Sequence, residues 1–306
     1  MLRFRLSFVV SLATMLLVAA CGKNPAPEPR TEPAVEKAKA EIPEATDAVE
    51  IVEETKEEPP AKKPTLTVQE AGGDAELGTL KMRFEYGVDA PEPKLLAAAK
   101  KDQYCGQFGL TSEVLLVHPK NKGIRNVVCY LYTGRGGSVL EEIPHEPAVV
   151  ELANQSCRFE PRVVVLQPGD TLRVTNPDDV GHNANLAFFN NKQQNLVIPP
   201  KQHKDVQIVK DEPAPIPTDC NIHPWMRAYL VVNSHPFVGV SDENGNLTIE
   251  GLPVGEELVF RVFHEAGSIN SVVVDGEDQE WKRSRVEIPI KAGTNDLGTV
   301  VIPEFP

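Results

Sequence analysis

Short apolar runs separated by turn residues fill the chain from Leu77 to its C-terminus. Runs of about four to eight residues rich in valine, leucine, phenylalanine and tyrosine, cut by glycine, proline, asparagine and aspartate, predict an all-β sandwich. In the first part of this region the expected strands are residues 80–86, 126–132, 148–152, 162–166, 171–175, 206–209 and 228–232. One short helix is expected at residues 95–101.

A second β unit begins near His235. Its expected strands are residues 237–240, 247–249, 257–264, 285–290 and 299–302. The pair Asn244-Gly245 is a hairpin signal, because both residues tolerate the positive φ of a tight turn. We therefore predict two folded domains, residues 75–233 and residues 234–306, which pack together because the link between them is short.

The N-terminus has the features of a secretory signal peptide. Arg3 and Arg5 precede an apolar run at residues 8–18, which is too short to span a membrane. The small residues that follow, and then Cys21, resemble a bacterial lipobox. We predict a signal peptide at residues 1–20, lipidation of Cys21, and an exported lipoprotein anchored in a membrane and facing the periplasm or the cell surface. The alternative is an ordinary signal peptide that ends in cysteine.

Residues 21–74 have the composition of a disordered tether. Proline, glutamate, alanine and lysine dominate, and aromatic residues are absent, so the segment cannot bury enough apolar surface to offset its ordering entropy. The whole chain has a net charge of −13. This charge argues against nucleic acid as a partner, because binding phosphates requires a basic face.

The chemistry is concentrated in the segment from Cys220 to Met226, which also contains His223. His182 lies upstream, after a predicted strand. Two imidazoles, one thiolate and one weak axial thioether are the ligands of a blue-copper electron-transfer site. The thiolate stabilises Cu(I), the imidazoles suit both oxidation states, and the thioether perturbs the geometry little between them. Three ligands on one loop converge at the end of a sandwich, where a fourth can join them.

This pattern resembles the cupredoxin family, and its loop resembles the amicyanin type, Cys-x2-His-x2-Met with proline and an aromatic residue before the methionine. The resemblance covers roughly residues 77–232. It implies a Greek-key sandwich and one type 1 copper held by His182, Cys220, His223 and Met226. It also implies a non-enzymatic protein that either transfers one electron to a redox partner, whose identity the sequence does not give, or serves to bind copper.

The resemblance assigns roles to the residues around the ligands as well. Asn183 would donate or accept hydrogen bonds across to the ligand loop and fix its geometry. The ring edge of His223 would be exposed to solvent as the electron port. Pro224 and Trp225 would form an apolar docking rim around it. The domain departs from small blue-copper carriers in its long N-terminal extension, which contains three cysteines.

Residues 234–306 resemble a carboxypeptidase regulatory-like, or transthyretin-like, β-sandwich. The resemblance is carried by residues 240–249 and by the turn at residues 252–255. Such modules are noncatalytic and support or dock neighbouring domains. This domain would therefore be a structural partner of the copper domain.

Apart from Cys21, the chain has four cysteines, which allow three full pairings. Cys105 and Cys157 lie in loop-like sequence, which favours a disulfide between them, whereas Cys129 lies within a predicted strand as a buried thiol. The alternative is that Cys220 is bonded to another cysteine. The protein would then be a non-redox binding or structural module of the cell surface.

Several histidines and Met226 each allow two interpretations, one structural and one metal-binding. His182 could be a hydrogen-bonded core histidine and Met226 a core methionine. His235 and His264 could form a second metal site, as a copper-dependent oxidase or reductase would need, or be histidines of the surface or the domain junction. His118 and His145 are expected to have no metal-binding role.

Overall fold

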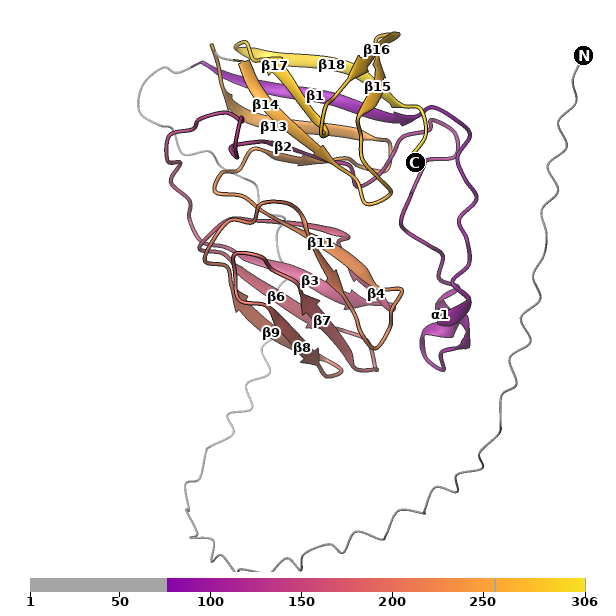
Figure 1. Cartoon of the computed structure of the whole chain (residues 1–306). Coiled ribbons are helices and arrows are strands. Elements are labelled where there is room, and N and C mark those ends of the chain that lie inside the picture. Colours follow the sequence, from indigo (N-terminus) through magenta and orange to yellow (C-terminus); the bar gives the residue numbers. More distant parts are fainter. Residues whose placement is uncertain (1–75, 256, 306) are drawn as a thin grey trace, which may run out of the picture. The chain divides into compact units, whose positions relative to one another are not determined.

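The computed structural model describes residues 76–255 and 257–305, and these residues form two β-sandwiches (Figure 1). The predicted all-β fold is confirmed. The signal peptide, Cys21 and the tether lie outside the described residues. We call the sandwich that carries His182 and Cys220 the central sandwich and the other one the outer sandwich.

The central sandwich consists of two sheets. The first has the strand order β5-β11-β10-β7-β8 and the second β4-β3-β6-β9. The strands are β3 (Val149–Gln155), β4 (Arg158–Glu160), β5 (Val163–Leu166), β6 (Thr171–Asn176), β7 (His182–Leu186), β8 (Gln194–Ile198), β9 (Gln202–Gln207), β10 (Ile216–Asp219) and β11 (Arg227–Val232).

Alternating side chains from these two sheets form one core. Along β6, Leu172 and Val174 are fully buried while their neighbours are partly exposed, which is the period-two pattern of a half-buried strand. Phe159, Phe188 and Leu230 fill the same core. Two of the predicted metal ligands, Cys220 and Met226, belong to this core.

The outer sandwich also has two sheets, with strand orders β13-β1-β18-β15-β16 and β12-β2-β14-β17. The strands are β1 (Leu77–Tyr86), β2 (Val128–Leu131), β12 (Val238–Val240), β13 (Asn246–Pro253), β14 (Glu257–Phe263), β15 (Ser271–Val274), β16 (Glu277–Glu280), β17 (Arg285–Pro289) and β18 (Gly293–Ile302). The predicted turn precedes β13, and Gly245 has a φ of +82° there. A β-carbon at Gly245 would collide with the carbonyl of Phe84, so only glycine fits.

The structure corrects the predicted boundary between the two domains. β1 pairs with β13 and β18, and β2 pairs with β12 and β14, so both strands belong to the outer sandwich. The sequence predicts them instead within the first domain, residues 75–233, together with the predicted metal ligands. The physical reason is that Leu80 and Phe84 find their apolar partners in the outer core, far along the chain.

The two sandwiches contact one another directly. Val128 and Tyr130 of the outer sandwich share a small apolar cluster with Val163 and Val231 of the central one. Arg162 also forms a bidentate ion pair across this contact: its Nε lies 2.5 Å from Glu265 Oε1 and its Nη2 lies 2.7 Å from Oε2. Between β1 and β2 lie the short helices α1 (Ala97–Lys101) and η1 (Cys105–Phe108). No helix in the described ranges is long and apolar enough to cross a membrane.

Candidate metal centre

The predicted metal ligands lie at the ends of adjacent strands of the central sandwich. His182 is the first residue of β7, and Cys220 directly follows β10, which pairs with β7. The loop after Cys220 carries His223 and ends at Met226, directly before β11. Strand pairing therefore brings residues that are almost forty positions apart to one edge of the sheet.

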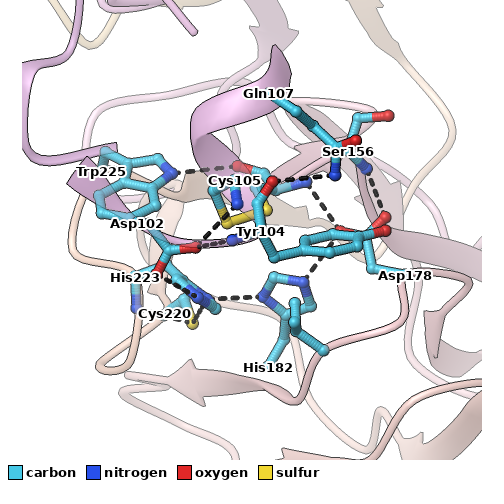
Figure 2. The surroundings of a disulfide bond; sticks show 12 residues. Asp102, Tyr104, Cys105, Gln107, Ser156, Asp178, His182, Cys220, His223 and Trp225 are labelled. Carbon is cyan, nitrogen blue, oxygen red and sulfur yellow. Dashed lines mark hydrogen bonds and ion pairs between the residues drawn. A yellow bond between two sulfur atoms is a disulfide. The ribbon is translucent and has the colours of Figure 1, made fainter. Parts of the chain in front are cut away.

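His182, Cys220 and His223 converge on one point. The two Nδ1 atoms of the histidines are 2.8 Å apart, and Cys220 Sγ lies 3.7 Å from His223 Nδ1 (Figure 2). One ligand atom from each of the three residues lies within 4.8 Å of the others. Cys220 is a free thiol, and all three side chains are almost completely buried.

Asn183 makes hydrogen bonds across to the ligand loop. Its Oδ1 accepts the backbone N–H groups of Asn221 at 2.8 Å and Ile222 at 3.2 Å, and it lies 3.4 Å from Cys220 Sγ. The Asn183 N–H and the His223 N–H both donate to Cys220 Sγ, at 3.5 and 3.3 Å. The sulfur is thus held by two backbone donors before any metal binds, which fixes its position.

Met226 is buried at the base of the same loop. Its backbone N–H donates to the His223 carbonyl at 2.9 Å, and its own carbonyl accepts the Cys220 N–H at 3.1 Å. These two bonds close the loop into a tight turn. The Met226 side chain packs in the central core and is 1% exposed. Its role as an axial ligand stays a prediction.

Two carboxylates face the outer ring nitrogens of the histidines, and the sequence reasoning missed both. His182 Nε2 lies 3.0 Å from Asp178 Oδ2, and His223 Nε2 lies 3.9 Å from Asp102 Oδ2. Metal-binding histidines commonly donate their second N–H to a carboxylate, which fixes the ring orientation. Asp178, four residues before His182, could have been found from its spacing. Asp102 comes from the N-terminal extension, and no local pattern points to it.

Burial keeps both imidazoles in the form that binds metals. It lowers the pKa of His182, although the hydrogen bond to Asp178 acts in the opposite direction. Burial also lowers the pKa of His223, and the neighbouring His182 lowers it further. The hydrogen bond from the Cys105 N–H lowers the pKa of the Asp102 carboxyl. At neutral pH the site therefore presents neutral imidazole nitrogens, as metal ligation requires.

The expectation that the His223 ring edge is open to solvent is wrong. His223 is 5% exposed, although Pro224 beside it is exposed. Asp102 lies over its Nε2, and the Trp225 ring packs against it with 5.2 Å between ring centroids. Trp225 is itself partly buried, because its Nε1–H donates to the Cys157 carbonyl at 3.2 Å. Of the predicted docking rim, Pro224 is exposed and Trp225 is half-buried, and the rim itself stays a prediction.

The other cysteines have definite states in the structure. Cys105 and Cys157 form a disulfide, the pairing that their loop-like sequence favours. Cys129 is a buried free thiol on β2. Cys220 is a free thiol, so the structure does not contain the disulfide to Cys220 that the alternative interpretation requires.

The remaining histidines lie apart from this cluster. His235 stacks on Phe237, and His264 stacks on Phe305 and contacts the Arg125 carbonyl. Both rings are buried, so they are not surface histidines, and their alternative place at the domain junction stays a prediction. The groups of potential metal ligands among the described residues include neither. The His145 ring is hydrogen-bonded to Asp170 and Gln167, and His118 Nδ1 accepts hydrogen bonds from two backbone N–H groups of a turn.

Comparison with known proteins gives weak similarities to copper proteins. No family model and no curated protein matches the chain. A Cu(I) structure of an amicyanin variant is 18% identical, with a TM-score of 0.25 over 28% of this chain and 82% of that chain. A purple cupredoxin from Nitrosopumilus maritimus is 20% identical, with a TM-score of 0.24 over 28% of this chain and 99% of that chain.

A copper-containing nitrite reductase from Thermus scotoductus is also similar. It is 19% identical, with a TM-score of 0.25, and the match covers 33% of this chain and 25% of that chain. Each of these similarities covers a third of this chain or less. Function is therefore best argued from the residues of the site itself.

The donor set fits copper. Two neutral nitrogens and a free thiol converge in a buried pocket, which suits a soft or borderline metal and excludes the oxygen-rich cage that calcium or magnesium prefers. A methionine sulfur as a further donor, the role predicted for Met226, would separate a blue-copper site from a structural zinc site. The donors of His182, Cys220 and His223 are already close together, so their binding of a metal requires little rearrangement.

Proposed function

We propose that this chain is a type 1 copper protein that binds one copper ion through His182, Cys220, His223 and Met226 and carries single electrons. The observation that carries this proposal is the convergence of a free, buried thiol with two neutral imidazoles at the end of a β-sandwich. A bound copper would alternate between Cu(I) and Cu(II).

The protein's own residues would keep the coordination geometry constant between these two states. Asn183 and the backbone of the ligand loop hold the sulfur, and Asp178 holds the His182 ring. A site that changes little on oxidation lowers the reorganisation needed for electron transfer. The core position of Met226 supports a weak, distant thioether in the same pocket.

The protein would act as a carrier and not as an enzyme. The candidate ligand groups among the described residues all contain His182 or His223, which supports one metal centre and not two separate ones. The outer sandwich would be the noncatalytic support that its resemblance to regulatory-like modules implies. The N-terminal segment supports export and attachment to a membrane through lipidated Cys21, with a redox protein as the partner.

Titration of the apoprotein with Cu(II) tests this function. We expect a blue colour with an intense visible absorption from the copper–thiolate bond, saturating at one copper per chain. Cys220→Ala should abolish the absorption and leave the β fold intact by circular dichroism. Cys129→Ala removes the other free buried thiol and is the matched control, which should keep the colour. A colourless wild-type protein, or colour that survives Cys220→Ala, contradicts the proposal and leaves a non-redox binding module.

A further inference from the structure

Residues 94–112 form a long loop between β1 and β2 whose two ends lie side by side, and we call this loop the cover. Its two ends are joined: Leu95 bridges Thr111, the Leu96 N–H donates to the Leu110 carbonyl at 2.9 Å, and the Ser112 N–H donates to the Lys94 carbonyl at 2.8 Å. The segment therefore leaves the outer sandwich and returns to it as one unit that contains α1 and η1.

The cover packs on the central sandwich and not on its own. Ala99, Cys105 and Leu110 are buried in the central core, and Tyr104 and Phe108 pack against it. The disulfide from Cys105 to Cys157 fastens the cover covalently beside β4. The hydroxyl of Tyr104 also accepts the Asp179 N–H at 3.2 Å, next to the loop that leads to His182.

The disulfide of the cover lies over the outer edges of both candidate ligand histidines (Figure 2). One donor atom each of Asp102, Cys105 and His223 lie within 4.8 Å of one another, and the same holds for Cys157, Asp178 and His182. Each half-cystine also donates its backbone N–H to one of the two carboxylates: Cys105 to Asp102 at 2.7 Å and Cys157 to Asp178 at 2.8 Å.

The cover accounts for the burial of His223. Ile222 and Pro224 flank His223 on the ligand loop and are exposed, so the loop itself faces outward. His223 is nevertheless almost inaccessible, and the groups over its Nε2 edge are Asp102 of the cover and the Trp225 ring. Access to this edge from solvent therefore requires displacement of the cover.

We propose that the cover is a lid latched by the Cys105–Cys157 disulfide, which closes the His223 edge of the metal centre and sets how fast metal enters and leaves. The part of this inference that concerns metal rests on the proposed function above. The part that concerns closure of His223 does not, because it is a property of the chain without metal. The outer sandwich thereby contributes the element that controls access to the central one.

Histidine modification in the apoprotein tests the lid directly. Diethyl pyrocarbonate reacts with accessible imidazole nitrogens, and peptide mass spectrometry gives the rate for each histidine. We expect His223 to react at least about tenfold more slowly than the exposed His203 of β9, since the reagent reaches it only when the cover opens. In Cys105→Ala/Cys157→Ala the His223 rate should rise toward the His203 rate, while His203 itself stays unchanged.

Two results would overturn the inference: equal rates for His223 and His203 in the intact protein, or an unchanged His223 rate in the double variant. The buried His235 and His264 report unfolding, because they react only if the outer sandwich opens. If His235 or His264 reacts in the double variant, that variant is partly unfolded and Leu96→Ser is used in its place. The Leu96→Ser change loosens the packing of the cover and leaves the disulfide intact. An unchanged His223 rate in Leu96→Ser then overturns the lid.

Copper uptake separates this inference from the proposed function. If both hold, the absorption should appear at least about tenfold faster after addition of Cu(II) to the double variant than to the wild type, with the same final intensity. If the wild type and the double variant take up copper at equal rates and both reach full colour, the lid is rejected and the copper site is kept. A protein that stays colourless while its His223 is protected would reject the copper site and keep the lid.

Discussion

At the scale of single residues, Asn183 does the most to organise the site before metal binds. Its one side-chain oxygen accepts two backbone N–H groups of the ligand loop and approaches the Cys220 sulfur. Its Nδ2 donates to Asn195 Oδ1 at 2.6 Å, which fixes the amide orientation. The amide presents its acceptor oxygen to the loop and its donor nitrogen to Asn195 at the same time, which an ionised carboxylate, having no donor, could not do.

Asn183→Ala should therefore weaken copper binding. The variant leaves two loop N–H groups without an acceptor, and loss of such an indirect support of a metal ligand typically lowers affinity by about 10–100-fold. Competition with a copper chelator measures the affinity. Asn185→Ala, two residues along the same strand, is the matched control, because no loop residue depends on its side chain for the bonds described above. Equal affinities of the two variants would refute the role of Asn183.

At the scale of elements, the strands that the sequence predicts well are those with alternating or continuous apolar residues. β1, β6 and β11 agree with the predicted ranges to within a few residues. β7, β8 and β10 were not predicted, because β7 and β8 are rich in asparagine and glutamine and β10 is short and contains a proline. These are the strands that position His182 and Cys220, so the ligands were recognisable from their spacing while the strands holding them were not.

Asp102 and the cover could not be predicted from the sequence for a different reason. Asp102 reaches His223 from more than a hundred residues upstream, through a segment whose own strands belong to the outer sandwich. Local patterns give element type but not the long-range pairing that decides which sheet a strand joins. The misplaced domain boundary and the expected open port of His223 have this same origin.

The assignment of β1 to the outer sandwich predicts the effect of removing it. A chain that begins at residue 88 lacks β1, which lies between β13 and β18 and buries Leu80 and Phe84 completely. Each lost side chain of this size costs about 1.5–3 kcal/mol of burial, so cooperative unfolding of the outer sandwich should disappear. Thermal unfolding followed by circular dichroism measures this, with a chain that begins at residue 76 as the control. Identical melting of the two chains would contradict the assignment.

At the scale of the whole molecule, the two sandwiches are coupled by the chain itself and by their contact surface. The cover joins β1 to β2 in the outer sandwich and is fastened to the central one by a disulfide. The buried pair between Arg162 and Glu265 and the cluster around Val231 add a second connection. Stability of the outer sandwich therefore contributes to the position of the groups that lie over the candidate ligands His182 and His223.

The two buried histidines of the outer region predict how stability depends on pH. Burial lowers the pKa of His235 and that of His264 to about 4, against 6.5 in a solvated chain. Above pH 6.5 each ring is neutral in both states and stability is complete. Between pH 6.5 and pH 4 only the unfolded chain takes up the proton, so each histidine should cost up to roughly 3 kcal/mol as the pH falls.

Urea unfolding between pH 4 and pH 7 measures this loss. His264→Gln removes one titrating ring and should make the free energy of unfolding fall less steeply with decreasing pH. His203→Gln is the control, because the His203 ring is exposed on β9. If the free energy of unfolding of His264→Gln falls with decreasing pH as steeply as that of the wild type, the buried His264 ring is not a cause of the pH dependence.

Crystals of the copper-loaded protein, measured at the copper absorption edge, give the most direct test of the metal centre. The account predicts a single anomalous peak per chain, within bonding distance of His182 Nδ1, His223 Nδ1 and Cys220 Sγ and beside the Met226 sulfur. A peak at His235 or His264 instead, or no ordered copper between the three side chains, would contradict it.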